Sequence, residues 1–198
     1  IEGIDTAKWS YNYYEGAKVF TDPYAKRVFG LEKWGNPKRQ KIAGALTDQP
    51  FDWEKEEESQ RPFEDVVLYG LNVRGFTMHK SSGVKNRGTF EGLMEKIPYL
   101  KELGINTVEL MPCYEYEECM ERIPGTAQPE KEVRRYNLWG FQNGYYFAPK
   151  ASFSAINNPQ LSVKNMVKAL HQNGIEIILH FYFPDSVRQM IILEVIRY

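Results

Sequence analysis

Four glutamates on or just after one predicted strand are the residues whose types can support acid–base chemistry. Glu109 lies within the predicted strand 105–111, and Glu115, Glu117 and Glu118 follow it. Two carboxyl groups act as general acid and base only when their environments separate their pKa values. We interpret Glu109 as a structural partner of a polar group on a neighbouring strand, and the other three as solvated carboxylates of a polar loop. None of the four is predicted to be catalytic.

His180 and Asp185 are two further polar residues in suggestive positions. His180 ends the last predicted strand, and α/β enzymes commonly place functional groups at the carboxyl ends of parallel strands. We nevertheless favour a hydrogen-bonded histidine that fills space over a catalytic one. Asp185 stands just ahead of an apolar-periodic run, which is the ordinary position of a helix N-cap.

Residues 136–146 combine aromatic and amide side chains, in the order Tyr-Asn-Leu-Trp-Gly-Phe-Gln-Asn-Gly-Tyr-Tyr. A sugar ring presents apolar C–H faces that stack on flat side chains, and its hydroxyls take polar contacts. This loop therefore suits a carbohydrate ligand. For Trp139 and Tyr146 we favour a place in the core over contact with a ligand.

Composition narrows the classes of partner. The chain has 198 residues with 25 Lys+Arg against 26 Asp+Glu, so no overall field favours nucleic acid or an anionic membrane, and a neutral partner is expected. No apolar run approaches the about 20 residues that cross a bilayer. The Cys and His residues lack zinc spacing, and we expect no metal and no cofactor. The absence of a signal peptide in this segment slightly favours the cytoplasm.

Strands and helices are predicted to alternate after residue 64, which implies parallel strands joined by right-handed crossovers and an α/β fold. The apolar run 66–69 is typical of a buried strand, and a polar and aromatic excursion covers 112–161. Thr89 and Ser162 are predicted helix N-caps, and Gly104 and Gly174 are predicted C-terminal stops. The predicted elements in order are strand 66–69, helix 89–104, strand 105–111, helix 162–174, strand 175–179 and helix 184–195.

Residues 1–64 show no sustained helical period, and we expect irregular β structure there. Residues 9–20 are predicted to form a small hairpin that turns at Gly16. The acidic run 54–58 is interpreted as a solvated linker.

Four motifs resemble the α-amylase superfamily, glycoside hydrolase family 13, and in particular its pullulanase, isoamylase and glycogen-debranching branch. They occur in the order and spacing of that family across nearly the whole chain. The motifs are Thr-Asp-Pro-Tyr-Ala-Lys at 21–26, Asp-Val-Val-Leu-Tyr at 65–69 with Val-Arg-Gly-Phe-Thr at 73–77, the stretch from Gly88 to Gly104, and Trp-Gly-Phe at 139–141 with Phe-Ala-Pro-Lys at 147–150.

The resemblance implies that residues 1–64 end an N-terminal β-sandwich of the glucan-binding type, and that residues 65–198 begin a catalytic TIM barrel. A closed barrel needs about 250 residues, so at most three strand–helix units fit. We expect a piece of a longer protein that hydrolyses α-1,6 bonds in α-glucans such as glycogen, starch or pullulan. A catalytically degenerate glucan-binding or scaffold protein is the alternative, and a self-contained three-layer α/β protein is disfavoured.

Departures from the family pattern bear on the site. Where the family has Asp-x-x-x-Asn-His after its third strand, this chain has His180, Pro184 and Asp185, and Gly70 and Asn72 replace the usual Glu and His after the first. Phe141 stands where a tyrosine usually stacks on the sugar. The resemblance assigns substrate contacts to Phe141, Trp139, His180, Asp185 and Asn72. It assigns no catalytic residue, because the family's carboxylates follow later strands.

We also expect self-association. A three-stranded parallel sheet leaves its third strand without a neighbour, and an unpaired edge is a template for pairing with another chain. The face that a barrel would turn inward includes, on whichever parity points inward, the apolar residues Val108, Leu110, Ile178 and Phe181.

Overall fold

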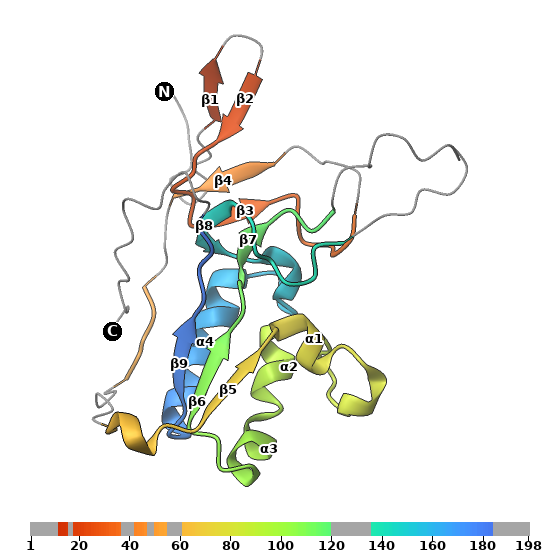
Figure 1. The fold of residues 1–198 in the computed structure, drawn as a ribbon. Coiled ribbons are helices and arrows are strands. Elements are labelled where there is room, and N and C mark those ends of the chain that lie inside the picture. Colours follow the sequence, from red (N-terminus) through yellow and green to blue (C-terminus); the bar gives the residue numbers. More distant parts are fainter. Residues whose placement is uncertain are drawn as a thin grey trace.

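The computed structural model describes residues 12–15, 18–36, 42–46, 50–54, 61–119 and 136–183. Its centre is a parallel sheet in the order β5–β6–β9, with helices packed on one face (Figure 1). Antiparallel strand pairs lie beyond the carboxyl ends of this sheet. The predicted helix 184–195, and Asp185 with it, lie outside the described residues.

The register of the parallel sheet decides which side chains face the helices. Strands β5 (Leu68–Leu71), β6 (Thr107–Leu110) and β9 (Glu176–Leu179) align Gly70 with Glu109 and Ile178. Because successive side chains alternate between faces, Val108 and Leu110 point to the helices and are fully buried. Ile178, of the opposite parity, is 47% exposed. Val108 and Leu110 were predicted for the inward face of a barrel but lie on the helix-covered face of the sheet.

The first parallel strand lies two residues later than predicted. Val67 and Leu68 are about half exposed, so the run 66–69 is not a buried strand. The prediction was wrong because an apolar run carries no information about whether both faces of a strand are covered. After β5 comes the short helix α1 (Val73–Thr77), capped by Asn72, which sequence periodicity did not reveal.

The predicted helix 89–104 is two helices, α2 (Phe90–Met94) and α3 (Ile97–Glu102). Thr89 caps the first as predicted, because its side chain accepts a hydrogen bond from the Gly92 N–H. The break has a local cause: Pro98 has no N–H to donate to the Met94 carbonyl. Gly104 ends the second helix with φ of 74°, the left-handed conformation that glycine favours.

Helix α4 (Pro159–Gln172) covers the sheet between β6 and β9. Its N-cap is Asn158, whose side chain accepts from the Leu161 N–H, so the prediction of Ser162 as the cap was wrong. Ser162 is buried inside the helix and hydrogen-bonds Ser154 and Glu91. Met166 and Leu170 of this helix complete the core with Phe90 and Leu93. None of the described helices is long and apolar enough to cross a membrane.

Antiparallel strands account for most of the remaining structure. The predicted N-terminal hairpin is confirmed by strand pair β1 (Asn12–Glu15) and β2 (Lys18–Thr21). Strand β3 (Arg27–Phe29) pairs with β4 (Ala43–Ala45). The excursion after β6 holds a further pair, β7 (Tyr114–Tyr116) and β8 (Gly144–Pro149), which the sequence reading missed. Short 3-10 turns occupy Phe63–Asp65, Lys80–Ser82 and Ala151–Phe153.

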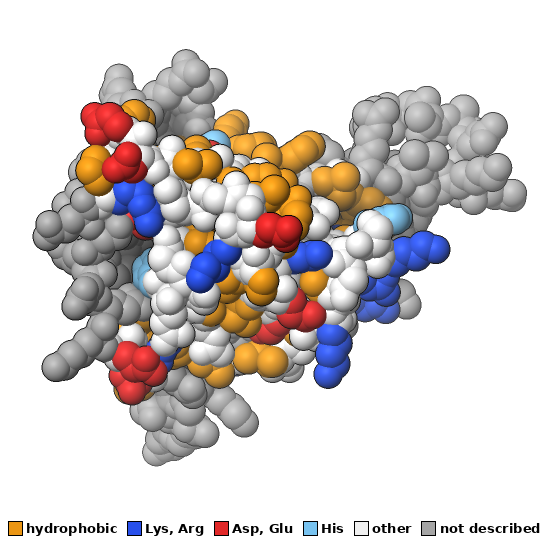
Figure 2. All heavy atoms as spheres, turned by 90° about the horizontal axis from the view of Figure 1, so that it is seen from below, with side chains coloured by type: hydrophobic (Ala, Val, Ile, Leu, Met, Phe, Trp, Pro, Cys, Tyr) orange, Lys and Arg blue, Asp and Glu red, His pale blue; other side chains and the backbone are white. Residues whose placement is uncertain are grey.

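The surface at the amino-terminal end of the parallel sheet mixes both signs of charge with hydrophobic side chains (Figure 2). One exposed member of the predicted acidic linker, Glu54, forms an ion pair with Lys168 at 2.7 Å, so that residue is not simply solvated. The presence of both signs of charge agrees with the nearly neutral composition of the chain.

Candidate functional site

Polar and aromatic residues from three separate segments meet at the carboxyl end of the parallel sheet. Asn72 follows β5, His180 follows β9, and the loop 137–142 joins them from the excursion. Asn72 accepts a hydrogen bond from Gly75 N–H at 2.8 Å and donates one to the Leu138 carbonyl at 3.1 Å. It therefore caps α1 and anchors the aromatic loop with one side chain.

His180 connects the sheet to the aromatic loop. Its Nδ1 lies 3.3 Å from Glu109 Oε1, and its ring meets the Phe141 ring edge-on with centroids 5.1 Å apart. Glu109 lies on the central strand β6, next to β9, so its side chain reaches the residue that follows β9. The contact agrees with the interpretation of Glu109 as the partner of a polar group on a neighbouring strand.

Three aromatic side chains at this edge remain open to solvent. Trp139 is 56% exposed, Phe141 40% and Tyr182 39%. The Phe141 and Tyr182 rings meet at a steep angle with centroids 6.3 Å apart, and each ring keeps part of its surface exposed to solvent. The prediction of Trp139 as a core residue was wrong, because more than half of its surface is exposed to solvent. Tyr146 is partly buried, and its hydroxyl donates to the Tyr182 carbonyl at 3.0 Å.

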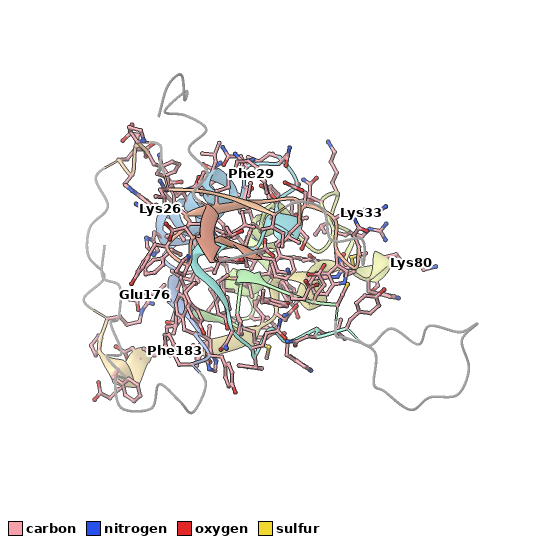
Figure 3. All side chains as sticks on the ribbon, turned by 90° about the horizontal axis from the view of Figure 1, so that it is seen from above. Lys26, Phe29, Lys33, Lys80, Glu176 and Phe183 are labelled. Carbon is pink, nitrogen blue, oxygen red and sulfur yellow. The ribbon has the colours of Figure 1, made fainter. Side chains whose placement is uncertain are left out.

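An aromatic cluster holds the segment after β9 beside the antiparallel pair. Phe181 stacks on Tyr114 with centroids 5.6 Å apart, and Phe183 packs on Tyr146 at 5.2 Å. Seen along the sheet from its carboxyl end, Phe183 lies on the same side as Glu176, far from Lys33 and Lys80 (Figure 3). The segment that carries His180 and Tyr182 is thereby fixed on the β9 side of the site.

A buried charge network lies behind the aromatic loop. Lys150 Nζ donates to Glu115 Oε1 at 2.9 Å, Glu118 Oε2 at 2.9 Å and the Tyr116 carbonyl at 2.8 Å. Lys150 and Glu115 are fully buried and Glu118 is 4% exposed. The prediction of Glu115 and Glu118 as solvated carboxylates was therefore wrong.

The environment of this network perturbs the groups around it. Burial raises the pKa of Glu115, although the Lys150 charge and the Ala151 N–H oppose that change. Burial also raises the pKa of Tyr116, with further increases from Glu118 and Glu115, and raises the pKa of the Cys113 thiol to about 12. These groups are shielded from solvent, as in a structural core.

Neither the buried charge network nor Tyr182 was predicted from the sequence to belong to this region. One signal was available: Lys150 ends the nearly apolar stretch Phe-Ala-Pro-Lys, and Glu115 alternates with two tyrosines. An isolated charge in an apolar strand pattern indicates a buried partner. Within the parts of the chain that the structure describes, no group of three His, Cys, Asp or Glu residues is placed to hold a metal ion.

Comparison with known proteins matches one family model, and the similar proteins agree with that family. The family model "Alpha amylase, catalytic domain" matches residues 49–187. The chain is 34% identical over 181 residues to chloroplastic isoamylase 1 of Arabidopsis thaliana, covering 85% of this chain and 23% of that protein. It is 32% identical to the glycogen operon protein GlgX homolog of Haemophilus influenzae, covering 85% and 27%.

A solved structure agrees with this relationship. Pullulanase from Paenibacillus barengoltzii, as a mutant complexed with maltotriose, superimposes with a TM-score of 0.61 at 26% identity, covering 86% of this chain and 28% of that one. The chain thus spans about a quarter of the length of the relatives it matches.

Proposed function

The chain belongs to the α-amylase family, and we propose that it supplies part of the α-glucan-binding surface of a debranching-type glycoside hydrolase without supplying the carboxylates that cleave the bond. Its family and its pullulanase neighbours imply a TIM-barrel fold for the parallel sheet. Isoamylase, GlgX and pullulanase relatives support a role in carbohydrate metabolism.

The proposal rests on one observation: exposed aromatic faces gather with polar groups at the carboxyl end of the sheet. The Phe141 and Tyr182 rings are partly exposed to solvent, His180 contacts Phe141, and Asn72 holds the loop that carries Phe141. Sugar rings stack on such faces, and their hydroxyls exchange hydrogen bonds with amide and imidazole groups. A neutral glucan also suits a chain whose charges nearly cancel.

The carboxylates of the described residues support binding better than cleavage. Retaining glycoside hydrolysis uses two carboxyl groups about 5 to 5.5 Å apart on either side of the bond. The three parallel strands carry two acidic residues, Glu109 and Glu176. Glu109 is paired with His180, and Glu176 lies at the far end of β9 beside Arg61 at 3.6 Å. Glu115 and Glu118 are buried against Lys150, where no sugar reaches them.

We further propose that residues 65–198 hold the first three strand–helix units of the barrel and that residues 1–64 end a preceding β domain. The parallel order β5–β6–β9 and the antiparallel pairs β1–β2 and β3–β4 support this division. The remaining units of the barrel would then supply the catalytic carboxylates of the whole protein.

A titration with maltohexaose, followed by NMR, tests the binding role. We expect a dissociation constant no tighter than about millimolar, near −4 kcal/mol, because one part of a barrel offers part of a subsite. Phe141→Ala should abolish the binding. Phe147→Ala is the matched control, because Phe147 is also exposed but packs against Tyr24 of the N-terminal segment. Micromolar binding that survives Phe141→Ala would refute the proposal.

The absence of cleavage is tested separately. Release of reducing sugar from pullulan, in proportion to the amount of this chain and retained through repurification, would contradict the proposal that it lacks the catalytic carboxylates.

The alternative function is a catalytically degenerate glucan-binding or scaffold protein. The pairing of His180 with Glu109 favours it, because this pair occupies the strand end where the family places an aspartate. The sequence of the whole protein distinguishes the two: a Gly-Phe-Arg-x-Asp stretch after a fourth strand supports the enzyme, and its absence supports the binding protein.

A further inference from the structure

The buried ammonium of Lys150 connects three neighbouring residues, two in strand β7 and one just after it. It spends its three N–H donors on Glu115, Glu118 and the Tyr116 carbonyl. Its ammonium also lies 4.3 Å from the centre of the Tyr116 ring. A buried ammonium with every donor used holds its partners in one geometry, because each alternative leaves a charge without a partner.

The aromatic loop rests on the outside of the same strand. Tyr114 Oη donates to the Gln142 carbonyl at 2.7 Å, and Asn137 N–H donates to the Glu118 carbonyl at 2.8 Å. The Gln142 side chain donates to the Glu117 carbonyl. Gly140 has φ of 80°, and a Cβ there would lie 2.6 Å from the Tyr116 ring. The loop that presents Phe141 therefore follows the position of residues 114–118.

A segment distant in sequence is attached to the same unit. Glu118 Oε1 accepts a hydrogen bond from Gly35 N–H at 2.7 Å, while its Oε2 accepts from Lys150. Trp34 stacks on Phe153 with centroids 5.7 Å apart, and the Arg74 guanidinium lies 4.8 Å from the centre of its ring. Arg74 belongs to α1, whose N-cap is Asn72. Glu118 thus connects the N-terminal segment to both sides of the candidate site.

We propose that Lys150 and Glu118 are positioning residues: they fix the loop 137–142, and so set the orientation of Phe141 toward a bound glucan, without touching it. The part that concerns glucan rests on the proposed function. The part that concerns the loop stands on the contacts alone.

Glu115 and Glu118 form a matched pair for the test. Each is buried, each gives one oxygen to Lys150, and each gives the other oxygen to a backbone N–H, Ala151 for Glu115 and Gly35 for Glu118. An amide in place of either carboxylate loses one of its two acceptors. Only the Glu118→Gln change falls at the junction with the loop and the N-terminal segment.

We compare Glu118→Gln and Glu115→Gln in the full chain by the NMR signals of the tryptophan indole N–H groups and by titration with maltohexaose, after checking the fold by circular dichroism. Trp34 reports on the buried network and Trp139 on the loop. We expect Glu118→Gln to shift both signals and to weaken maltohexaose binding about fivefold, a size common for changes that act through other residues. Glu115→Gln should change the Trp139 signal and the affinity less than Glu118→Gln does, because the second oxygen of Glu115 binds Ala151 N–H rather than Gly35 N–H.

A shift of Trp34 alone in Glu118→Gln would overturn the proposal, as would equal effects of the two variants on Trp139. If the unmodified chain binds no maltohexaose, the proposed function fails, while the Trp139 signal still decides whether the loop is coupled to the network.

Hydrogen exchange on the unmodified chain decides the matter if Glu118→Gln does not fold. The amides of Gly35 and Gly140 should become exchangeable together as urea is added, because one unit holds both. Exchange at Gly140 well before Gly35 would refute the coupling.

Discussion

Replacing Lys150 with methionine is the most severe single change that the structure suggests. Methionine keeps the length of the apolar stem, so the change removes the charge with little change of volume. It leaves the Glu115 and Glu118 carboxylates buried without their cation, and the Tyr116 carbonyl without its donor. Removing one partner of a buried ion pair typically costs about 3 to 5 kcal/mol. The free energy of unfolding of a domain is about 5 to 15 kcal/mol in all, so we expect a loss of about 4 kcal/mol to bring this chain close to unfolding.

Urea unfolding followed by tryptophan fluorescence and circular dichroism measures the loss. Lys168→Met is the matched control, because Lys168 pairs with the exposed Glu54 and should cost less than about 1 kcal/mol. The triple variant Lys150→Met, Glu115→Gln and Glu118→Gln should recover much of the stability, because it leaves no charge buried. A loss for Lys150→Met no greater than that for Lys168→Met would refute the reasoning.

The pH dependence of the Lys150→Met variant gives an independent check. The pKa of Glu115 is already raised in the folded chain, and removing the lysine charge that opposes this shift raises it further. A group with a raised folded pKa stabilises the fold below its unfolded pKa and loses that contribution as pH rises through the folded pKa. The cost of the variant should therefore shrink as pH falls from above the folded pKa of Glu115 toward its unfolded pKa.

Three further predictions concern other parts of the chain. Hydrogen bonds from the Lys85 and Asn86 N–H groups lower the pKa of Glu95, so Glu95 should stabilise that loop above its unfolded pKa and lose this effect as pH falls through its folded pKa. Hydrogen exchange of the two amides should therefore become faster in acid, and in Glu95→Gln it should show no such pH dependence. Cys113, buried with its pKa raised to about 12, should resist iodoacetamide in the native chain and react in urea, and rapid native alkylation would contradict its burial. The open sheet face around Ile178 should produce a concentration-dependent dimer or larger assembly in sedimentation equilibrium, and a 23.1 kDa monomer at high concentration would contradict this expectation.

Local chemistry in the sequence determined the order of the three parallel strands and several helix ends. Thr89 caps a helix because its hydroxyl satisfies an N–H three residues away, and Gly104 stops one because it tolerates a positive φ. The hairpin 12–21 likewise needs only neighbouring residues. Family motifs added what such local rules lack, since they identified Phe141 as a candidate ligand contact within a loop of many aromatic residues.

The tertiary structure alone decided which side chains are covered and which meet. Glu115 reads as a surface charge until tertiary contacts bury it against Lys150, whose ammonium lies over the Trp34 and Phe153 rings. Trp139 reads as core until the loop turns it outward. The meeting of Asn72, Phe141 and His180 depends on strand register and on a loop more than sixty residues from Asn72 along the chain. Burial and contact depend on what other segments supply, and a local pattern of residue types does not contain that information.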